Sequence, residues 1–158
     1  MNDQPNKRVL ESECVQQVRQ MGILMGQLYL HFAKTLISEL GAEEGKRLIL
    51  KAVTNYGAER GRTTRQVVED AGLKPTLENY YRFSDLPQFG WDANEEGTTY
   101  CCYAEPWLKR GEEELGRLYC EVDIAKIKAY NPNIRIRRMK SLLDGDSHCH
   151  YIIEEKVS

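Results

Sequence analysis

Hydrophobic positions recur at helical spacing through the first half of the chain. Over residues 11–40 they follow the i, i+3, i+4 pattern of one long amphipathic helix, and Gly41 suits the cap at its end. The same pattern predicts a second helix over residues 42–71. An interior glycine costs a helix about 1 kcal/mol relative to alanine, so two glycine pairs indicate close packing against another backbone or, in the first helix, a break. These glycines are Gly22, Gly26, Gly57 and Gly61.

The pattern changes to shorter elements after residue 72. A short helix or extended segment is expected over residues 76–85, followed by an aromatic, irregular stretch and a turn at residues 94–97. β-Branched and aromatic residues then predict a strand over residues 98–104, with a short partner strand near Phe89. From Pro106 one helix is expected to run through Ala129.

The end of the chain predicts a β-hairpin. Strands over residues 134–143 and 147–156 flank the pair Asp144-Gly145, which is a strong signal for a tight primed turn. Because strand side chains alternate between faces, Cys149 should face one side while His148 and His150 face the other. The expected fold is therefore α+β, with N-terminal helices packed on a small antiparallel sheet that ends in this hairpin.

Length and composition favour one soluble domain. A chain of 158 residues can bury roughly two-thirds of its unfolded surface, so we expect a disordered tail over residues 1–8 and a single domain over residues 9–158. No apolar run approaches the roughly 18 residues of a membrane span, and the polar N-terminus resembles neither a signal nor a transit peptide. We therefore expect a cytoplasmic protein without a membrane partner.

Charge and cysteine content narrow the function classes. A net charge of −2 gives no electrostatic reason to expect nucleic-acid binding, and the basic residues near position 137 are interpreted as a solvated strand face. Five cysteines without a secretion signal indicate thiols or metal ligands rather than a disulfide framework.

Two cysteines and an aspartate are the main candidates for chemistry. Cys120 and Asp123 are three residues apart and share a helix face, and the helix could pack against the strand that holds Cys149. Three interpretations stay open. They are a cysteine nucleophile with a histidine or carboxylate partner, a metal site built from these residues and a histidine, and structural thiols beside a polar hairpin.

The long helices add candidates of a second kind. His31 could transfer protons near neutral pH, although a histidine on a packed helix is more often structural. Arg60 and Arg62 could bind a carboxylate through their planar guanidinium groups, or they could be exposed charges on a solvated turn.

Several of these segments resemble one enzyme family. The helix motif Tyr119-Cys120-x-x-Asp123, the following Pro132 and the closing Gly145-Asp146-Ser147-His148-Cys149-His150-Tyr151 are similar to the end of the L-2-amino-thiazoline-4-carboxylic acid hydrolases. The segment Tyr56-Gly57-x-x-Arg60-Gly61 resembles the middle helix of that family. The hairpin is also similar to four-vinyl-reductase-type ligand-binding domains, which are small α+β folds.

The resemblance implies hydrolysis of a C–N or C–S bond in a small cyclic amidine of the thiazoline type, giving a carbamoyl-cysteine without a cofactor or metal. Cys120 would attack the ring carbon, or Asp123 would activate water, with Cys149 and His31 as further catalytic candidates. The substrate-binding candidates are Tyr56, Arg60, Arg62 and Tyr119.

Two other functions remain alternatives. One is a non-enzymatic binding or sensory module that uses the same pocket without turnover. The other is a protein that binds metal through cysteine and histidine side chains. The expected partner is a small-molecule substrate, and self-association into a homo-oligomer is left open.

Overall fold

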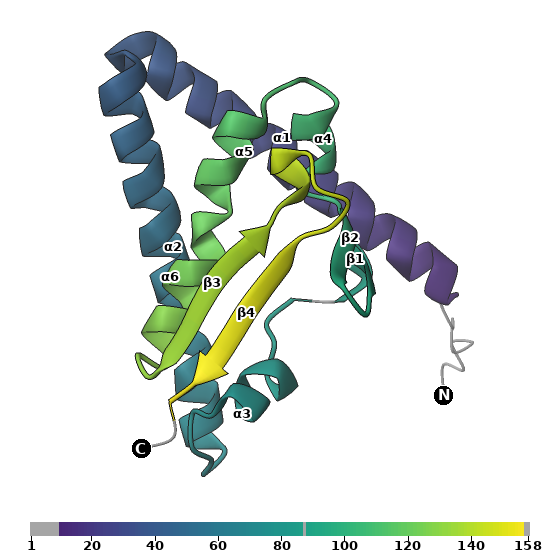
Figure 1. Cartoon of the computed structure of the whole chain (residues 1–158), viewed down its shortest axis with the longest axis vertical. Helices are drawn as coiled ribbons and strands as arrows, with labels where there is room; N and C mark the ends of the chain where they lie inside the picture. The colour runs from purple at the N-terminus through teal and green to yellow at the C-terminus, as the bar shows by residue number, and fades with distance from the viewer. Residues whose placement is uncertain (1–9, 87, 157–158) are drawn as a thin grey trace, which may run out of the picture.

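The computed structural model describes residues 10–86 and 88–156, so the predicted tail over residues 1–8 lies outside the described residues. Helices and two small antiparallel sheets alternate along the chain, and the predicted α+β class is confirmed (Figure 1). The helices are α1 (Glu11–Leu40), α2 (Ala42–Asp70), α3 (Leu77–Arg82), α4 (Glu105–Leu108), α5 (Glu113–Tyr119) and α6 (Glu121–Tyr130). The strands are β1 (Trp91–Asn94), β2 (Gly97–Cys101), β3 (Ile134–Lys140) and β4 (His150–Glu155).

The two long helices meet at a corner formed by one residue. Gly41 has φ of +81°, a value that L side chains rarely adopt, and its amide donates to the Ile37 carbonyl. Figure 1 shows α1 and α2 diverging from this corner, with α5 and α6 beside α2 and the β3–β4 hairpin across them. Within the described residues, no helix is long and apolar enough to cross a membrane.

The paired glycines allow helices to approach closely, as predicted. A Cβ atom on Gly57 would lie 2.4 Å from the Val122 carbonyl oxygen, and one on Gly61 would lie 2.1 Å from the Lys126 carbonyl oxygen. Both contacts join α2 to α6. The glycine pair in α1 marks a second close approach, and the alternative of a helix break there is wrong because α1 is continuous.

The single helix expected from Pro106 to Ala129 is wrong. The structure divides this segment into α4, α5 and α6. Gly111 has φ of +66°, which ends the first piece, and Cys120 stands between the second and third with φ −63° and ψ −12°. The short α4 is held by Trp107, which is buried and donates its indole N–H to the Gly26 carbonyl at 2.8 Å.

The first hairpin forms where it was expected. The Asn94 side-chain oxygen accepts from the amides of Glu96 and Gly97 and so closes the turn between β1 and β2. The partner strand begins at Trp91 rather than around Phe89. β2 ends at Cys101, short of the predicted residue 104, because the chain then turns into α4.

The closing hairpin has a longer connection than predicted. β3 and β4 pair with Ile136 opposite Ile153 and Arg138 opposite Tyr151, and their connection contains a 3-10 turn capped by Ser141. Gly145 has φ of +86°, but it ends this turn instead of forming a two-residue primed turn. The prediction of strand bounds at residues 143 and 147 is therefore wrong.

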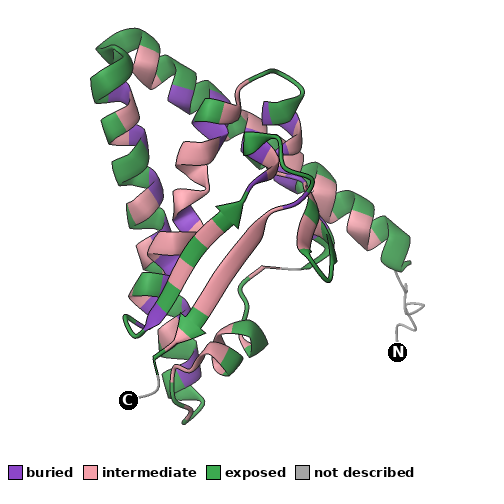
Figure 2. Cartoon of the chain, viewed as in Figure 1, coloured by how far each residue is buried: buried purple, intermediate pink, exposed green. Residues whose placement is uncertain are grey.

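The two hairpins form separate sheets that are joined by one isolated backbone bridge. Thr98 and Cys149 exchange backbone hydrogen bonds of 3.0 and 2.8 Å, which is an isolated bridge. Buried residues gather where the helices face one another and the hairpins (Figure 2). One core cluster centres on Trp107 and Leu30, and the other on Tyr130 and Val68.

Candidate active site

An open cleft of about 560 Å³ lies between α2, α3, α6 and the β1–β2 hairpin. Its walls combine aromatic rings with an acid and two cations, so it holds both apolar and charged surface. The lining residues are Arg60, Tyr80, Tyr81, Ser84, Leu86, Gln88, Trp91, Ala93, Thr98, Asp123 and Lys126.

Asp123 is the acid in this cleft. Burial raises the pKa of its carboxyl group, because the charged form loses water, while Arg60, Lys126 and Arg138 oppose the shift. The net direction is upward. Asp123 is therefore a carboxyl group whose proton is held more tightly than usual, which is a property suited to moving protons near neutral pH.

Two of these cations share one carboxylate. The guanidinium of Arg60 donates two hydrogen bonds of 2.8 Å to Asp85, and the ammonium of Lys126 donates to the same group. Lys126 is only 4% exposed, and a buried ammonium without a partner is energetically unfavourable, so its pairing with Asp85 stabilises the charge. Burial alone would raise the pKa of Asp85, but the two cations lower it to about 2.

Cys120 lies behind Asp123, among other polarisable groups. Burial raises the pKa of its thiol, and Asp123, Cys101 and Cys149 raise it further, while Arg138 opposes them. The thiol is consequently protonated at neutral pH, and it lacks the electropositive surroundings of an activated cysteine. Cys149 is turned toward the same region, and its sulfur accepts from the Leu142 amide at 3.3 Å.

In the part of the chain that the structure describes, Arg138 has a buried hydrogen-bond donor that lacks a partner, close to Cys120 and Asp123. Its Nη2 donates to Glu121 at 3.0 Å, whereas its Nη1 is buried without a hydrogen-bond partner among the described residues. Buried nitrogen donors are normally paired. Because Arg138 also acts electrostatically on both Cys120 and Asp123, the free donor lies beside the reactive groups.

Tyrosines separate the cleft from the helical core. The Tyr119 ring stacks on Tyr103 with centroids 5.7 Å apart, and the Arg60 guanidinium lies 5.4 Å from the centre of the Tyr56 ring. Burial raises the pKa of Tyr119, so its phenol stays neutral.

The structure divides the sequence-predicted site residues among neighbouring places. Arg60 and Asp123 line the cleft. Cys120 and Cys149 do not line it, but Asp123 and Cys149 both act electrostatically on the Cys120 thiol. Tyr56 and Tyr119 line a separate apolar hollow of about 220 Å³ between α1 and α2. His31 and Arg62 are exposed on the long helices and line no part of this cleft. The catalytic and binding roles assigned to all of these residues from the sequence stay predictions.

The hairpin histidines lie elsewhere. His148 is 4% exposed and forms a 2.9 Å hydrogen bond with the Ser147 hydroxyl, and His150 bonds to the Glu96 carbonyl at 2.8 Å. The His150 bond ties β4 to the β1–β2 turn, whereas the His148 bond stays within the connection between β3 and β4. Neither histidine lines the cleft.

Sequence reasoning missed Lys126 and Asp85. Lys126 follows Asp123 by three residues, so both lie on one face of α6, and this spacing could have drawn attention to it. Asp85 reaches Arg60 from 25 positions away in the chain, and no local signal indicates that contact.

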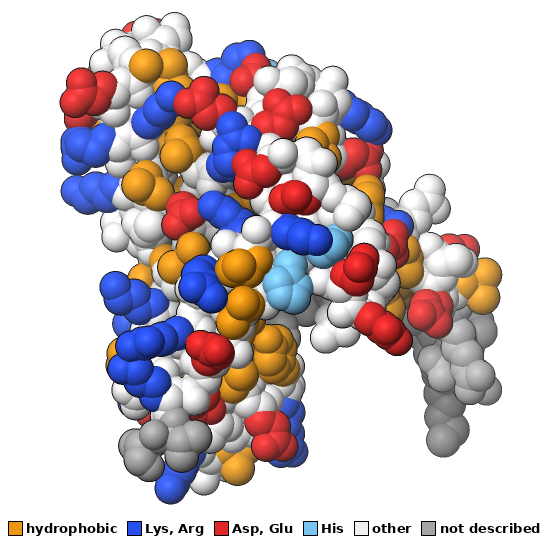
Figure 3. Space-filling view, viewed as in Figure 1, with side chains coloured by type: hydrophobic (Ala, Val, Ile, Leu, Met, Phe, Trp, Pro, Cys, Tyr) orange, Lys and Arg blue, Asp and Glu red, His pale blue; other side chains and the backbone are white. Residues whose placement is uncertain are grey.

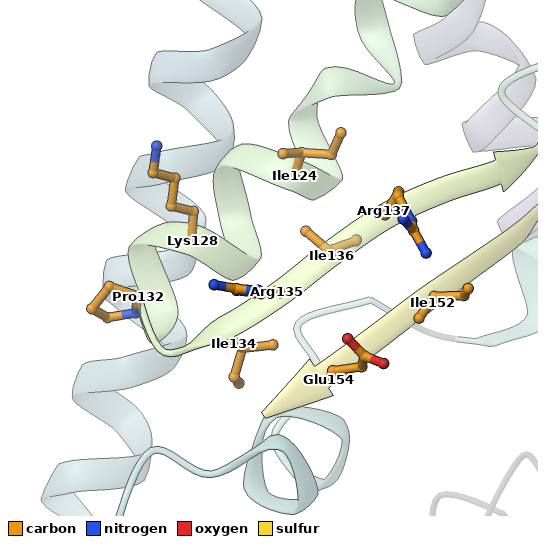
Figure 4. A pocket seen from close by; sticks show the side chains of 9 residues that line it. All are labelled: Ile124, Lys128, Pro132, Ile134, Arg135, Ile136, Arg137, Ile152 and Glu154. Carbon is orange, nitrogen blue, oxygen red and sulfur yellow. The ribbon is translucent and has the colours of Figure 1, made fainter. Parts of the chain in front are cut away.

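A second hollow lies on the other side of α6 (Figure 4). It has a volume of about 430 Å³ and is lined on the hairpin side by two exposed arginines, by buried or half-buried isoleucines and by one acid, Glu154. In Figure 3 the face of the hairpin shows basic and acidic side chains around a hydrophobic strip. None of the sequence-predicted site residues lines this hollow, so the cleft at Asp123 is the better candidate.

The metal-binding alternative gains no ligand set from the structure. Over residues 10–86 and 88–156, no three histidine, cysteine, aspartate or glutamate side chains are placed to hold one ion. Cys120, Asp123 and Cys149 are near one another but do not form such a group.

Comparison with known proteins now identifies the family. The family model described as L-2-amino-thiazoline-4-carboxylic acid hydrolase matches residues 21–153. The chain belongs to this family. The match includes α2, α3, α6 and the β1–β2 hairpin, so every wall of the cleft lies within the hydrolase-family region. No curated protein and no solved structure matches the chain significantly.

Proposed function

We propose that this chain is a hydrolase for a small cyclic amidine of the 2-amino-thiazoline-4-carboxylate type, and that Asp123 activates the attacking water. The observation that carries the proposal is the half-buried Asp123 carboxyl group, with its raised pKa, in a cleft that also contains two cations. Membership of the hydrolase family supports the reaction class. The proposed substrate type follows the description of that family, and the proposed mechanism is inferred from the residues of the cleft.

The proposed step adds water to the amidine carbon of the ring. Asp123 removes a proton as the water oxygen bonds to that carbon, and the carbon–sulfur bond of the ring then breaks. The proton returns to the departing sulfur, and a carbamoyl-cysteine with a free thiol results. A carboxylate also complements the positive charge of a protonated amidine, so the same group holds the ring in place before attack.

Cys120 is the weaker candidate for the attacking group. Its thiol is held in the protonated form by burial and by the neighbouring Asp123 carboxylate. A covalent route would first have to remove that proton, whereas water activation uses Asp123 directly. We therefore assign Cys120 and Cys149 to the wall behind the reacting groups.

Arg60 and Lys126 form the proposed subsite for the substrate carboxylate. Both already bind one carboxylate, that of Asp85, which is at the cleft surface with its side chain 32% exposed. We propose that a substrate carboxylate takes the place of Asp85. The guanidinium fork of Arg60 suits such a group because it can donate two parallel hydrogen bonds.

The test follows turnover of 2-amino-thiazoline-4-carboxylate by release of a free thiol and by mass spectrometry of the product. We expect Asp123→Asn to lower kcat/KM by at least about 100-fold, since the water loses its base. The activity of the unaltered chain should fall on the acidic side of its pH profile at a pH above the usual aspartate range, because the ionised form is required.

Asp70→Asn is the matched control, because Asp70 is exposed at the end of α2 and lines no part of the cleft. It should leave turnover unchanged. Binding of the substrate without any turnover would contradict the hydrolase assignment and favour the sensory module. Loss of binding for the analogue that lacks the carboxylate would support the Arg60 and Lys126 subsite.

A further inference from the structure

Helix α1 has a second hydrophobic face that the fold leaves uncovered. Its inner face packs on the body of the protein through Leu30 and Ala33, which are each 1% exposed. On the outer side, Met21, Leu28 and Phe32 are 59%, 58% and 64% exposed. A surface helix normally has charged and polar residues opposite its buried face.

Charge is absent from the middle of this helix on every side. Residues 20–33 include no aspartate, glutamate, lysine or arginine, although 29% of the whole chain is charged. A helix that is hydrophobic on both faces is expected to be buried on both. The outer face of α1 therefore has the composition of an interface rather than of a solvated surface.

The spacing of the outer residues is that of a coiled coil. Met21, Met25, Leu28 and Phe32 recur at intervals of four, three and four positions, which is the spacing of a and d sites in a heptad repeat. The half-buried Cys14 and Val18 continue this spacing toward the N-terminus, and Val18 also lies against Gly90. The repeat drifts slowly around a straight helix, so it favours packing against one other helix rather than against a sheet. This heptad seam consists of Met21, Met25, Leu28 and Phe32.

We infer that two copies of this chain pair through the heptad seam of α1. A second copy brings an identical repeat, so the same residues can pack against themselves about a two-fold axis. The exposed side chains of the seam, with Leu24 beside them, present on the order of 500 Å² if each large side chain has roughly 200 Å². A stable dimer needs about 800 Å² from each partner, so the seam supplies most of the required area.

The flanks of the seam favour another copy over a membrane surface. A helix that lies on a lipid surface usually has lysine or arginine beside its apolar face. Glutamines such as Gln20 and Gln27 lie in this part of α1, and they can border a dimer without charge repulsion.

The seam also borders the candidate site. The Tyr103 hydroxyl lies 3.8 Å from the sulfur of Met25, and the Tyr103 ring stacks on Tyr119. A helix paired with α1 would therefore lie beside the stacked rings of Tyr103 and Tyr119. The inference does not depend on the proposed reaction, because it concerns a surface outside the cleft.

Sedimentation velocity over a range of about 1 to 100 µM tests the pairing. We expect the sedimentation coefficient of the unaltered chain to correspond to twice the monomer mass. Leu28→Glu would place like charges across the two-fold axis, and it should raise the dimer dissociation constant at least about 100-fold. Because Leu28 is exposed within one copy, the variant should keep its helical circular dichroism and its melting temperature at monomer concentrations.

Gln20→Glu is the matched control, because it adds the same charge to the same helix outside the seam. It should leave the dimer intact. A monomeric unaltered chain throughout the range would overturn the inference, as would an unchanged dimer in Leu28→Glu. Flotation with phosphatidylcholine vesicles gives a further outcome: a monomer that floats with lipid would show a membrane-facing helix and would also overturn it.

Discussion

The contact between α2 and α6 leads to a prediction for Gly61→Ala. The added methyl group would lie 2.1 Å from the Lys126 carbonyl oxygen, whereas real Cβ contacts are essentially never below 3.0 Å. The obstacle is backbone, so it cannot rotate away. The two helices would have to separate by about 1 Å, and interiors tolerate such overpacking poorly.

Two opposing effects set the size of the change. Overpacking of this kind destabilises a protein by about 1–3 kcal/mol. Alanine is the better helix former and returns about 1 kcal/mol. We therefore expect a net loss of about 0–2 kcal/mol in the free energy of unfolding. For a domain of this size, that loss lowers Tm by up to roughly 6 °C.

The displacement should also be visible at the site, since α6 positions both Asp123 and Lys126. Thermal unfolding and turnover are measured together, with Thr63→Ala as the control, because Thr63 is exposed on the same helix. The control should change stability by less than about 0.5 kcal/mol. A Gly61→Ala protein that is more stable than the original would refute the argument that backbone contact requires this glycine.

Three further predictions concern other contacts. Trp107→Phe should destabilise the fold by about 1–3 kcal/mol in denaturant titration, because the buried Gly26 carbonyl loses its donor; an unchanged midpoint would contradict this contact. The pKa of Asp85 is about 2, below its value in the unfolded chain, so the pairing stabilises the fold above pH 4 and the stabilisation is lost as pH falls toward 2. Solvent screening reduces the effect to about 1 kcal/mol, and Asp85→Asn should flatten the stability–pH curve in that window, whereas an unchanged slope would disprove the pairing. Cys120→Ser should keep turnover within about tenfold if water is the nucleophile, whereas abolished turnover in a folded protein would restore the covalent route.

Local patterns were sufficient for the regular parts of the fold. Periodicity predicted α1 with its observed bounds, and the spacing of Gly57 and Gly61 predicted a close helix contact before its partner was known. Cys120 and Asp123 were found because three-residue spacing fixes a shared helix face. These features depend on neighbours in the chain, and the sequence contains that information directly.

The parts that were missed depend on distant contacts. The break at Cys120 could not be predicted from periodicity, since the apolar positions over residues 113–130 keep helical spacing and no proline interrupts them. Asp85 pairs with Arg60 across two separate elements. His31 was a catalytic candidate because of its side-chain chemistry. Such a role also requires that the side chain face the cleft, and periodicity did not reveal that His31 lies on an exposed face of α1.

The single bridge between Thr98 and Cys149 has a consequence for motion. It joins two sheets whose residues are about fifty positions apart, so its loop-closure entropy is set against two backbone hydrogen bonds. Other hydrogen bonds that hold the hairpin come from the side chains of His150 and Arg19, which bind the Glu96 and Phe89 carbonyls and Asp92, and these contacts are exposed to water. The β1–β2 hairpin should therefore detach in local openings that leave the helical core folded. Because this hairpin supplies Trp91 and Thr98 to the cleft, each opening widens the entrance. Access to the cleft is then governed by the exchange rate of one hairpin, not by the stability of the domain.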